Sequence, residues 1–240
     1  MSRRSERLEW LLSLDPAERH ARLRKLKESS KRELRYHWRL WAAPAQLAPP
    51  GDWSTWLIMA ARGFGKTRAG AEWLREIADH DPYARIALVG ATLNEVRAVM
   101  VEGESGILSI TPRGRRPRFE PSLRRLTWPN GASATLYSAL EPESLRGPQH
   151  SHAWCDELAK WENVGGKAEK AWDNLSFGLR LGELPRTLVT TTPRAVPLLR
   201  RILKEDGLAL IRSIHSPGAS LHDCLADPDC ARDTDRGHYN

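Results

Sequence analysis

The stretch Trp56-Leu57-Ile58-Met59-Ala60-Ala61-Arg62-Gly63-Phe64-Gly65-Lys66-Thr67 indicates the fold most directly. Its leading apolar residues predict a short buried strand, a glycine-bearing turn follows, and residues 68–79 have the pattern of a helix. This order, with Lys-Thr where the helix begins, is typical of a phosphate-binding loop (P-loop). Because glycine has no Cβ, Gly63 and Gly65 let backbone N–H groups approach phosphate oxygens, and the positive end of the helix faces the same anion.

The residues of this loop are predicted to bind the phosphates of ATP and its metal ion. Lys66 is predicted to reach the β- and γ-phosphates of ATP, and the Thr67 hydroxyl to ligate Mg²⁺. One position departs from the usual G-x-x-x-x-G-K-[ST] spacing, because Ala60 stands where glycine is expected. The alternative is a chance Gly-Lys-Thr between a strand and a helix. The residues predicted to line the nucleotide here are Ala61, Arg62, Gly63, Phe64, Gly65, Lys66, Thr67 and Arg68.

Composition is that of a globular protein. The chain has 240 residues, 28% of them charged and 40% hydrophobic, enough for one domain with an appendage. No apolar run approaches the roughly 20 residues of a membrane span, and no export signal is recognisable. Cys155, Cys224 and Cys230 lack C-x-x-C spacing, so neither disulfides nor zinc is predicted. We therefore expect a cytoplasmic protein that does not associate with membranes.

Positive charge is concentrated near the N-terminus. The net charge is +7, and residues 1–50 hold twelve Arg and Lys side chains against six Asp and Glu. Such a bias suits contact with nucleic acid, although a solvated helical face is an equal alternative. Residues 5–41 are predicted to be helical, with a new start at Asp15-Pro16, and the prolines at 44–50 mark a linker. Gln46 in this linker could read an adenine edge, because its amide offers a donor and an acceptor; an exposed loop glutamine is the alternative.

The rest of the chain alternates strands and helices. Strands are predicted at residues 85–90, 152–155, 187–190 and 208–214, helices at 94–102 and 198–205, and a hairpin around Pro129-Asn130-Gly131, with its strands at 125–128 and 134–137. Residues 111–122 are expected to be a loop rich in proline and arginine. The prediction is an α/β P-loop NTPase of the additional-strand (ASCE) type, with a mostly parallel sheet flanked by helices. Expected domains are a basic helical segment and linker (1–50), an ATPase domain (51–214) and a polar tail (215–240).

Two acids follow the apolar run at 152–155. Asp156 is predicted to complete the Mg²⁺ shell, and Glu157 to act as the general base for the attacking water. A strand that leads into a solvated turn is the alternative. Thr190, Thr191 and Thr192 end a later strand, where ligands bind in open α/β sheets, and could sense the γ-phosphate; the alternative is that threonine simply favours strands. Arg146 and Arg62 are candidates for an arginine finger.

With these residues in hand, the chain resembles the ATPase portion of phage large terminase subunits, which package double-stranded DNA. More narrowly, it resembles terminases of prophages and gene-transfer-agent-like elements. The resemblance covers residues 8–210. It is carried by GDW at 51–53, ARGFGKTRAGAEW at 61–73, VEGESG at 101–106, WPNGA at 128–132, PESLRGPQ at 142–149, AWCDELAKW at 153–161 and TTTPR at 190–194.

The resemblance implies an ATP-hydrolysing motor that moves DNA into a procapsid. It implies Lys66 and Thr67 as Walker A residues, Asp156 as the Walker B magnesium residue and Glu157 as the catalytic base. Arg146 is similar to the family's finger arginine, the threonines at 190–192 to its coupling motif. Implied partners are double-stranded DNA, a portal protein, a small terminase subunit and further copies of the chain in a ring, in the cytoplasm of the bacterial host.

The C-terminal end departs from the family pattern. Large terminases carry an RNase H-like nuclease domain, and residues 215–240 show no strand pattern for one, so no nuclease activity is expected. Two alternatives remain beside the packaging motor. One is a truncated remnant that binds nucleotide or DNA without turnover, and the other is a helicase-like translocase, although no second motor domain is recognisable.

Overall fold

The computed structural model describes residues 10–11, 13–27, 30, 34, 36–161 and 164–211. The chain forms two compact units, Met1–Leu47 and Ala48–Asn240. The first contains helix α2 (Pro16–Arg24) and two 3₁₀ turns, η1 (Trp38–Leu40) and η2 (Pro44–Gln46). The tail predicted over 215–240 lies outside the described residues.

Helix α2 begins as predicted but ends early. The Asp15 carboxylate accepts hydrogen bonds from the N–H groups of Ala17 and Glu18, which satisfies two donors of the first turn. The helix then closes with tight bonds from Lys25 N to Arg22 O and from Leu26 N to Leu23 O. Residues 25–27 are therefore not helical, and the helix predicted over 5–41 is wrong at this point. Local closure of the last turn competes here with helix extension.

The second unit is built on an eight-stranded sheet with the order β3-β4-β5-β2-β6-β7-β1-β8. Six strands run parallel, while β3 and β4 pair antiparallel beside β5 at one edge. The strands are β1 (Thr55–Met59), β2 (Arg85–Gly90), β3 (Arg118–Glu120), β4 (Arg125–Thr127), β5 (Ser133–Ser138), β6 (His152–Cys155), β7 (Arg186–Thr191) and β8 (Leu208–Ile211). Strand β7 lies between β1 and β6, so the predicted additional-strand topology is confirmed.

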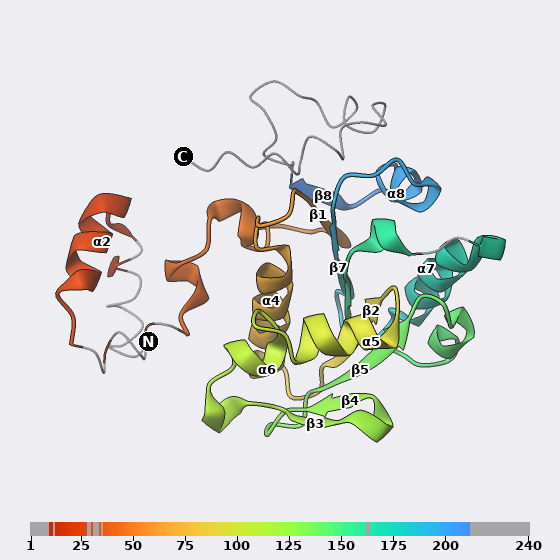
Figure 1. Ribbon diagram of the computed structural model, residues 1–240, viewed down its shortest axis with the longest axis horizontal. Coiled ribbons are helices and arrows are strands. Elements are labelled where there is room, and N and C mark those ends of the chain that lie inside the picture. The colour runs from red at the N-terminus through yellow and green to blue at the C-terminus, as the bar shows by residue number, and fades with distance from the viewer. Residues whose placement is uncertain are drawn as a thin grey trace. The chain divides into compact units, whose positions relative to one another are not determined.

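Helices cover both faces of this sheet (Figure 1). The α-helices are α4 (Lys66–His80), α5 (Leu93–Glu95), α6 (Ile107–Ile110), α7 (Lys167–Gly178) and α8 (Pro197–Ile202). Figure 1 shows α4, α5 and α6 on one side of the sheet and α7 and α8 on the other. A π-helix, η3 (Val96–Val101), continues α5. The remaining short turns are η4 (Arg113–Arg115), η5 (Pro121–Leu123), η6 (Pro142–Leu145), η7 (Leu158–Lys160) and η8 (Val164–Gly166).

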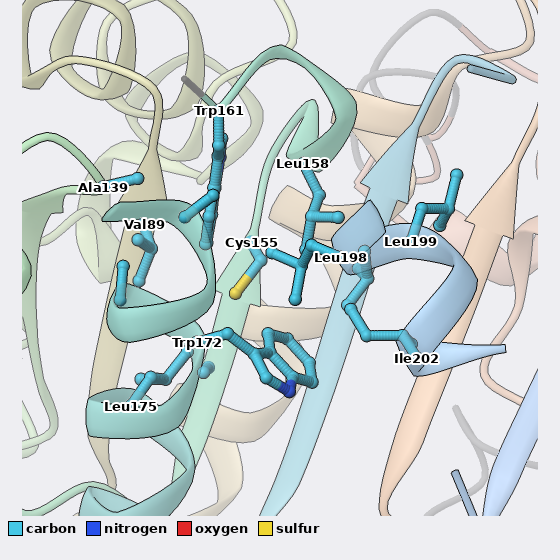
Figure 2. Packing of buried hydrophobic residues seen from close by; sticks show 14 of the residues in the cluster. Val89, Ala139, Cys155, Leu158, Trp161, Trp172, Leu175, Leu198, Leu199 and Ile202 are labelled. Carbon is cyan, nitrogen blue, oxygen red and sulfur yellow. The ribbon is translucent and has the colours of Figure 1, made fainter. Parts of the chain in front are cut away.

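The core on the α7 side follows from strand alternation. Leu57, Val189, Cys155, Val89 and Tyr137 lie in register across five strands and point to this face. Figure 2 shows Val89 and Cys155 on this face beside Trp172 and Leu175 of α7 and Leu198 and Ile202 of α8. Each fully buried large apolar side chain contributes roughly 1.5–3 kcal/mol, so this face fixes the strands whose ends carry the site.

Three segments differ from the sequence prediction. The helix predicted over 94–102 is mostly a π-helix, in which Glu102 N donates to Arg97 O, five residues back, at 2.9 Å. The loop predicted over 111–122 contains strand β3, which pairs with β4. Helix α7 was not predicted, although the buried residues Ala168, Ala171, Trp172 and Leu175 have helical spacing.

A buried histidine, His150, and a half-buried one, His152, near the start of β6 make stability sensitive to acid. Burial lowers the pKa of His150 and of His152 to about 4. An unfolded histidine titrates near 6.5, so the unfolded chain binds protons that the folded chain refuses as the pH falls from 6.5 to 4. The stabilisation is therefore complete above pH 6.5 and is lost below it, by about 3 kcal/mol for each histidine.

Urea unfolding between pH 7.5 and 4.5 tests this expectation. The His150→Phe variant should lose about half of the acid destabilisation that the histidine pair causes. His80→Phe, which removes an exposed histidine, is the matched control and should keep the wild-type slope. A wild-type unfolding free energy that stays constant from pH 7 to 5 would contradict the expectation.

Candidate nucleotide-binding site

The loop between β1 and α4 has the backbone that phosphate binding requires. Gly63 and Gly65 adopt φ values of 81° and 84°, in the left-handed region where a side chain is unfavourable. Gly65 is also the N-cap of α4, so the first N–H groups of that helix point out of the loop. Ala60 has no positive φ, and its N–H donates to Thr191 O. A Cβ is therefore tolerated there, which accounts for the missing first glycine.

Lys66 is held inside this loop. Its Nζ donates to Ala60 O at 2.8 Å and to Ala61 O at 3.1 Å, and lies 3.5 Å from Glu157 Oε1. The residue is only 6% exposed. Burial lowers the pKa of the amine, opposed by the carboxylates of Glu157 and Asp156. The structure thus brings the loop lysine and the acids after β6 into one site.

The two acids occupy the turn after β6. Asp156 is buried, and burial raises the pKa of its carboxyl to about 6, opposed by the Thr190 hydroxyl. Glu157 adopts φ 44° and ψ 49°, a left-handed conformation that is unusual for a residue with a Cβ. This backbone turn aims its carboxylate back toward Lys66.

Three consecutive threonines at the end of β7 hold this acidic turn. Thr190 Oγ1 donates to Asp156 Oδ1 at 2.7 Å, and Thr191 Oγ1 accepts from Ala159 N at 3.0 Å. Thr192 donates to Glu157 Oε2 through its hydroxyl at 3.1 Å and its N–H at 3.3 Å. Thr190 and Thr191 are fully buried. Thr190 and Thr192 therefore hold the two acids, while Thr191 holds the backbone that follows them.

The oxygen ligands at the site suit Mg²⁺. The Thr67 hydroxyl and the Asp156 carboxylate are hard donors, and Thr190 engages only Oδ1 of that carboxylate. Among the described residues, no group of three or more His, Cys, Asp or Glu could hold a metal alone. Mg²⁺ in phosphoryl-transfer sites relies on one or two carboxylates together with substrate phosphates, so this sparse donor set fits it.

The other predicted site residues lie in different places. Arg62 is exposed on the loop and its charge acts on Lys66. Arg146 follows η6, is 79% exposed, and lies 3.8 Å from Glu143. Arg68 turns away from the loop to donate two bonds to Glu72. Gln46 belongs to the first unit, where its amide oxygen caps η2 by accepting from Ala43 N. The roles predicted for these residues stay predictions.

The packing behind the site was not predicted from the sequence. Trp154 was read only as an apolar strand residue, yet its indole N–H donates to Thr190 Oγ1 at 2.9 Å. Gly70 on α4 belongs to the stretch 61–73 that carries the family resemblance, and a Cβ there would lie 2.3 Å from the Trp154 ring. A tryptophan two residues before the acids, with a glycine four residues after Lys66, was the available signal.

A P-loop, a parallel sheet and an extra strand between β1 and the acid-bearing β6 together define an α/β P-loop NTPase. Within this class the family is also shown. Residues 57–206 match the model of the terminase large subunit, T4likevirus-type, N-terminal, and the chain belongs to this family. No curated protein sequence matches the chain.

Solved structures agree on the fold. The large terminase of the thermophilic bacteriophage D6E in complex with ADP aligns with TM-score 0.53 and 15% identity, over 85% of this chain and 48% of that one. The ATPase domain of the Thermus phage P74-26 large terminase aligns with TM-score 0.53 and 13% identity, over 68% and 76%. The HK97 bacteriophage large terminase gives 0.52 and 16%, over 76% and 43%. The chain thus spans about half the length of the D6E and HK97 proteins.

Across the part of the chain that the structure describes, no helix is long and apolar enough to cross a bilayer.

Proposed function

We propose that the chain is the ATP-hydrolysing motor of a phage large terminase and moves double-stranded DNA into a procapsid. The observation that carries the proposal is the 3.5 Å approach of Lys66 Nζ to Glu157 Oε1 at the mouth of a glycine-bearing loop. Membership of the terminase family and the ADP-bound relative of the same fold support it.

In this proposal each residue of the site has a separate role. Backbone N–H groups of residues 61–68 and the Lys66 amine bind the β- and γ-phosphates. Glu157 orients a water molecule and accepts its proton, while Thr192 fixes that carboxylate with two hydrogen bonds. Arg62 or Arg146 supplies positive charge to the departing γ-phosphoryl group; exposure of Arg146 favours a site on a neighbouring copy.

Asp156 and Thr67 are the residues that would hold Mg²⁺. When bound, the ion neutralises charge on the β- and γ-phosphate oxygens. The chain's own contribution is to present one free carboxylate oxygen of Asp156 by engaging the other with Thr190.

Loss of the γ-phosphate is relayed through the threonines that end β7. Thr190 contacts Asp156 and Thr192 contacts Glu157, so a shift of either acid displaces the end of this strand. The segment from β7 to α8 then transmits the displacement to elements that grip DNA. Partners are double-stranded DNA, a portal protein, a small terminase subunit and further copies of the chain in a ring, in the cytoplasm of the bacterial host.

DNA-dependent ATP hydrolysis by the purified chain tests the proposal. Hydrolysis that double-stranded DNA accelerates, together with packaging into procapsids, is the expected result. ATP binding without turnover would instead favour a remnant, and ATP-driven separation of DNA strands would favour a helicase-like translocase. A chain that neither binds nor hydrolyses ATP would overturn the proposal.

DNA affinity should fall steeply with salt and ignore sequence. A packaging motor contacts backbone phosphates, and each neutralised phosphate contributes a slope of about −0.9 to log K against log salt. Fluorescence anisotropy with two duplexes of equal length and unrelated sequence, from 50 to 200 mM KCl, measures both properties. A flat salt dependence, or a strong preference for one duplex, would contradict the expectation.

A further inference from the structure

Trp154 joins the nucleotide loop's helix to the acidic turn. It lies on β6, fully buried, with its ring against α4. A Cβ on Gly70 would lie 2.3, 2.6 and 2.8 Å from three atoms of that ring, so the two elements are in the closest contact that glycine permits. Helix α4 begins at Lys66, and Asp156 follows Trp154 by two residues. The indole therefore lies between the two halves of the site.

A directed chain of hydrogen bonds runs from this ring to Asp156. Trp154 Nε1 donates to Thr190 Oγ1 at 2.9 Å, and Thr190 Oγ1 donates to Asp156 Oδ1 at 2.7 Å. An indole N–H can only donate, so it occupies a lone pair of the hydroxyl and leaves the hydroxyl proton to be donated onward. The other acceptor in reach is Cys155 O, at 3.3 Å. Trp154 thus leaves the hydroxyl proton of Thr190 for the Asp156 carboxylate, the nearer of the two acceptors.

We propose that Trp154 is a positioning residue that, through Thr190, holds the Asp156 carboxylate for Mg²⁺-dependent ATP binding. The inference rests on the proposed function, because it assigns Asp156 to the metal. Mutation of a hydrogen-bond partner that orients a metal ligand typically lowers metal affinity by about 10- to 100-fold. Here the orienting residue also packs on α4, so a displacement of that helix reaches Asp156 through one side chain.

The Trp154→Phe variant removes the N–H donor and keeps an aromatic ring against Gly70. Isothermal titration with ATP, with and without Mg²⁺, is the measurement. We expect the gain in ATP affinity that Mg²⁺ provides to fall by roughly tenfold, and the metal-free affinity to stay unchanged. Trp128→Phe is the matched control, because Trp128 is also buried and its indole N–H has no hydrogen-bond partner among the described residues. It should leave both affinities unchanged.

A double-mutant cycle separates the relay from simple packing. In a Thr190→Val background, Trp154→Phe should have little further effect on the Mg²⁺-dependent gain, because the relay is already broken. Thr190→Ser keeps the hydroxyl and should retain most of the gain. Equal losses of metal-free and metal-dependent affinity, or a full effect of Trp154→Phe in the Thr190→Val background, would show that Trp154 is only structural and would overturn the inference.

The indole signal tests the hydrogen bond without nucleotide. In ¹H–¹⁵N spectra, the resonance assigned by its loss in Trp154→Phe should move in Thr190→Val and stay near its place in Thr190→Ser. If this resonance keeps its position in Thr190→Val, the relay is overturned, whatever the titrations show. If Mg²⁺ does not change the ATP affinity of the wild type, the proposed function fails. If the wild type responds to Mg²⁺ and Trp154→Phe responds equally, the positioning role alone fails.

Discussion

We expect Lys66→Ala to lower ATP turnover by a factor of about 10² to 10³, because it removes the only cation that the described structure buries in the loop. The amine is already positioned by Ala60 O and Ala61 O, so little ordering remains to be done when phosphate arrives. Glu157→Gln should reduce turnover as much for a different reason. The amide keeps the shape and can still accept from Thr192, but it cannot take a proton from water.

Measurements of ATP binding and of phosphate release during hydrolysis distinguish the two variants. Lys66→Ala should weaken ATP binding, whereas Glu157→Gln should bind ATP and fail to cleave it. Glu141→Gln, a change at an exposed glutamate paired with Arg124, is the control and should hydrolyse normally. Normal hydrolysis by both Lys66→Ala and Glu157→Gln would refute the site assignment.

Gly70→Ala should destabilise the protein by about 2 kcal/mol or more. Alanine favours a helix over glycine by about 1 kcal/mol, yet the new methyl group would overlap a fully buried indole at 2.3 Å. The Trp154 ring cannot move aside easily, because its N–H is bonded to Thr190. Overpacking therefore outweighs helix propensity, and α4 or β6 must shift at the site.

Urea unfolding of Gly70→Ala measures the loss. Gly114→Ala is the matched control, since a Cβ there meets nothing within 4 Å and its φ is not positive. That variant should unfold within about 0.5 kcal/mol of wild type. A Gly70→Ala protein as stable as wild type would mean that the packing of α4 on Trp154 is looser than described.

Local patterns in the sequence predicted the P-loop and the strand that carries the acids. Glycines at positive φ, the apolar run of β1 and the Asp-Glu pair after β6 are features of neighbouring residues, so they can be read from one stretch at a time. Alternation of strands with helices predicted a mostly parallel sheet of the additional-strand type, without an order for its strands. That β7 lies between β1 and β6 is seen only in the structure.

Contacts between distant segments could not be read in this way. The bond between Thr190 and Asp156 joins residues 34 apart, and its existence depends on the register of β6 with β7. The sequence therefore predicted that the threonines could sense the γ-phosphate, but not that Thr190 and Thr192 contact the two acids. Likewise, helical periodicity in the sequence does not distinguish the i→i−5 backbone bonds of the π-helix from those of an α-helix.

The left-handed backbone of Glu157 implies a trade between durability and chemistry. A residue with a Cβ at φ 44° gives up roughly 1–2 kcal/mol that glycine would not. Glu157→Gly would relax this turn, but it would also remove the carboxylate that lies beside the buried Lys66 amine and accepts two hydrogen bonds from Thr192. In the proposed function, these contacts and the demand for turnover together would offset the strain of a left-handed backbone at this position.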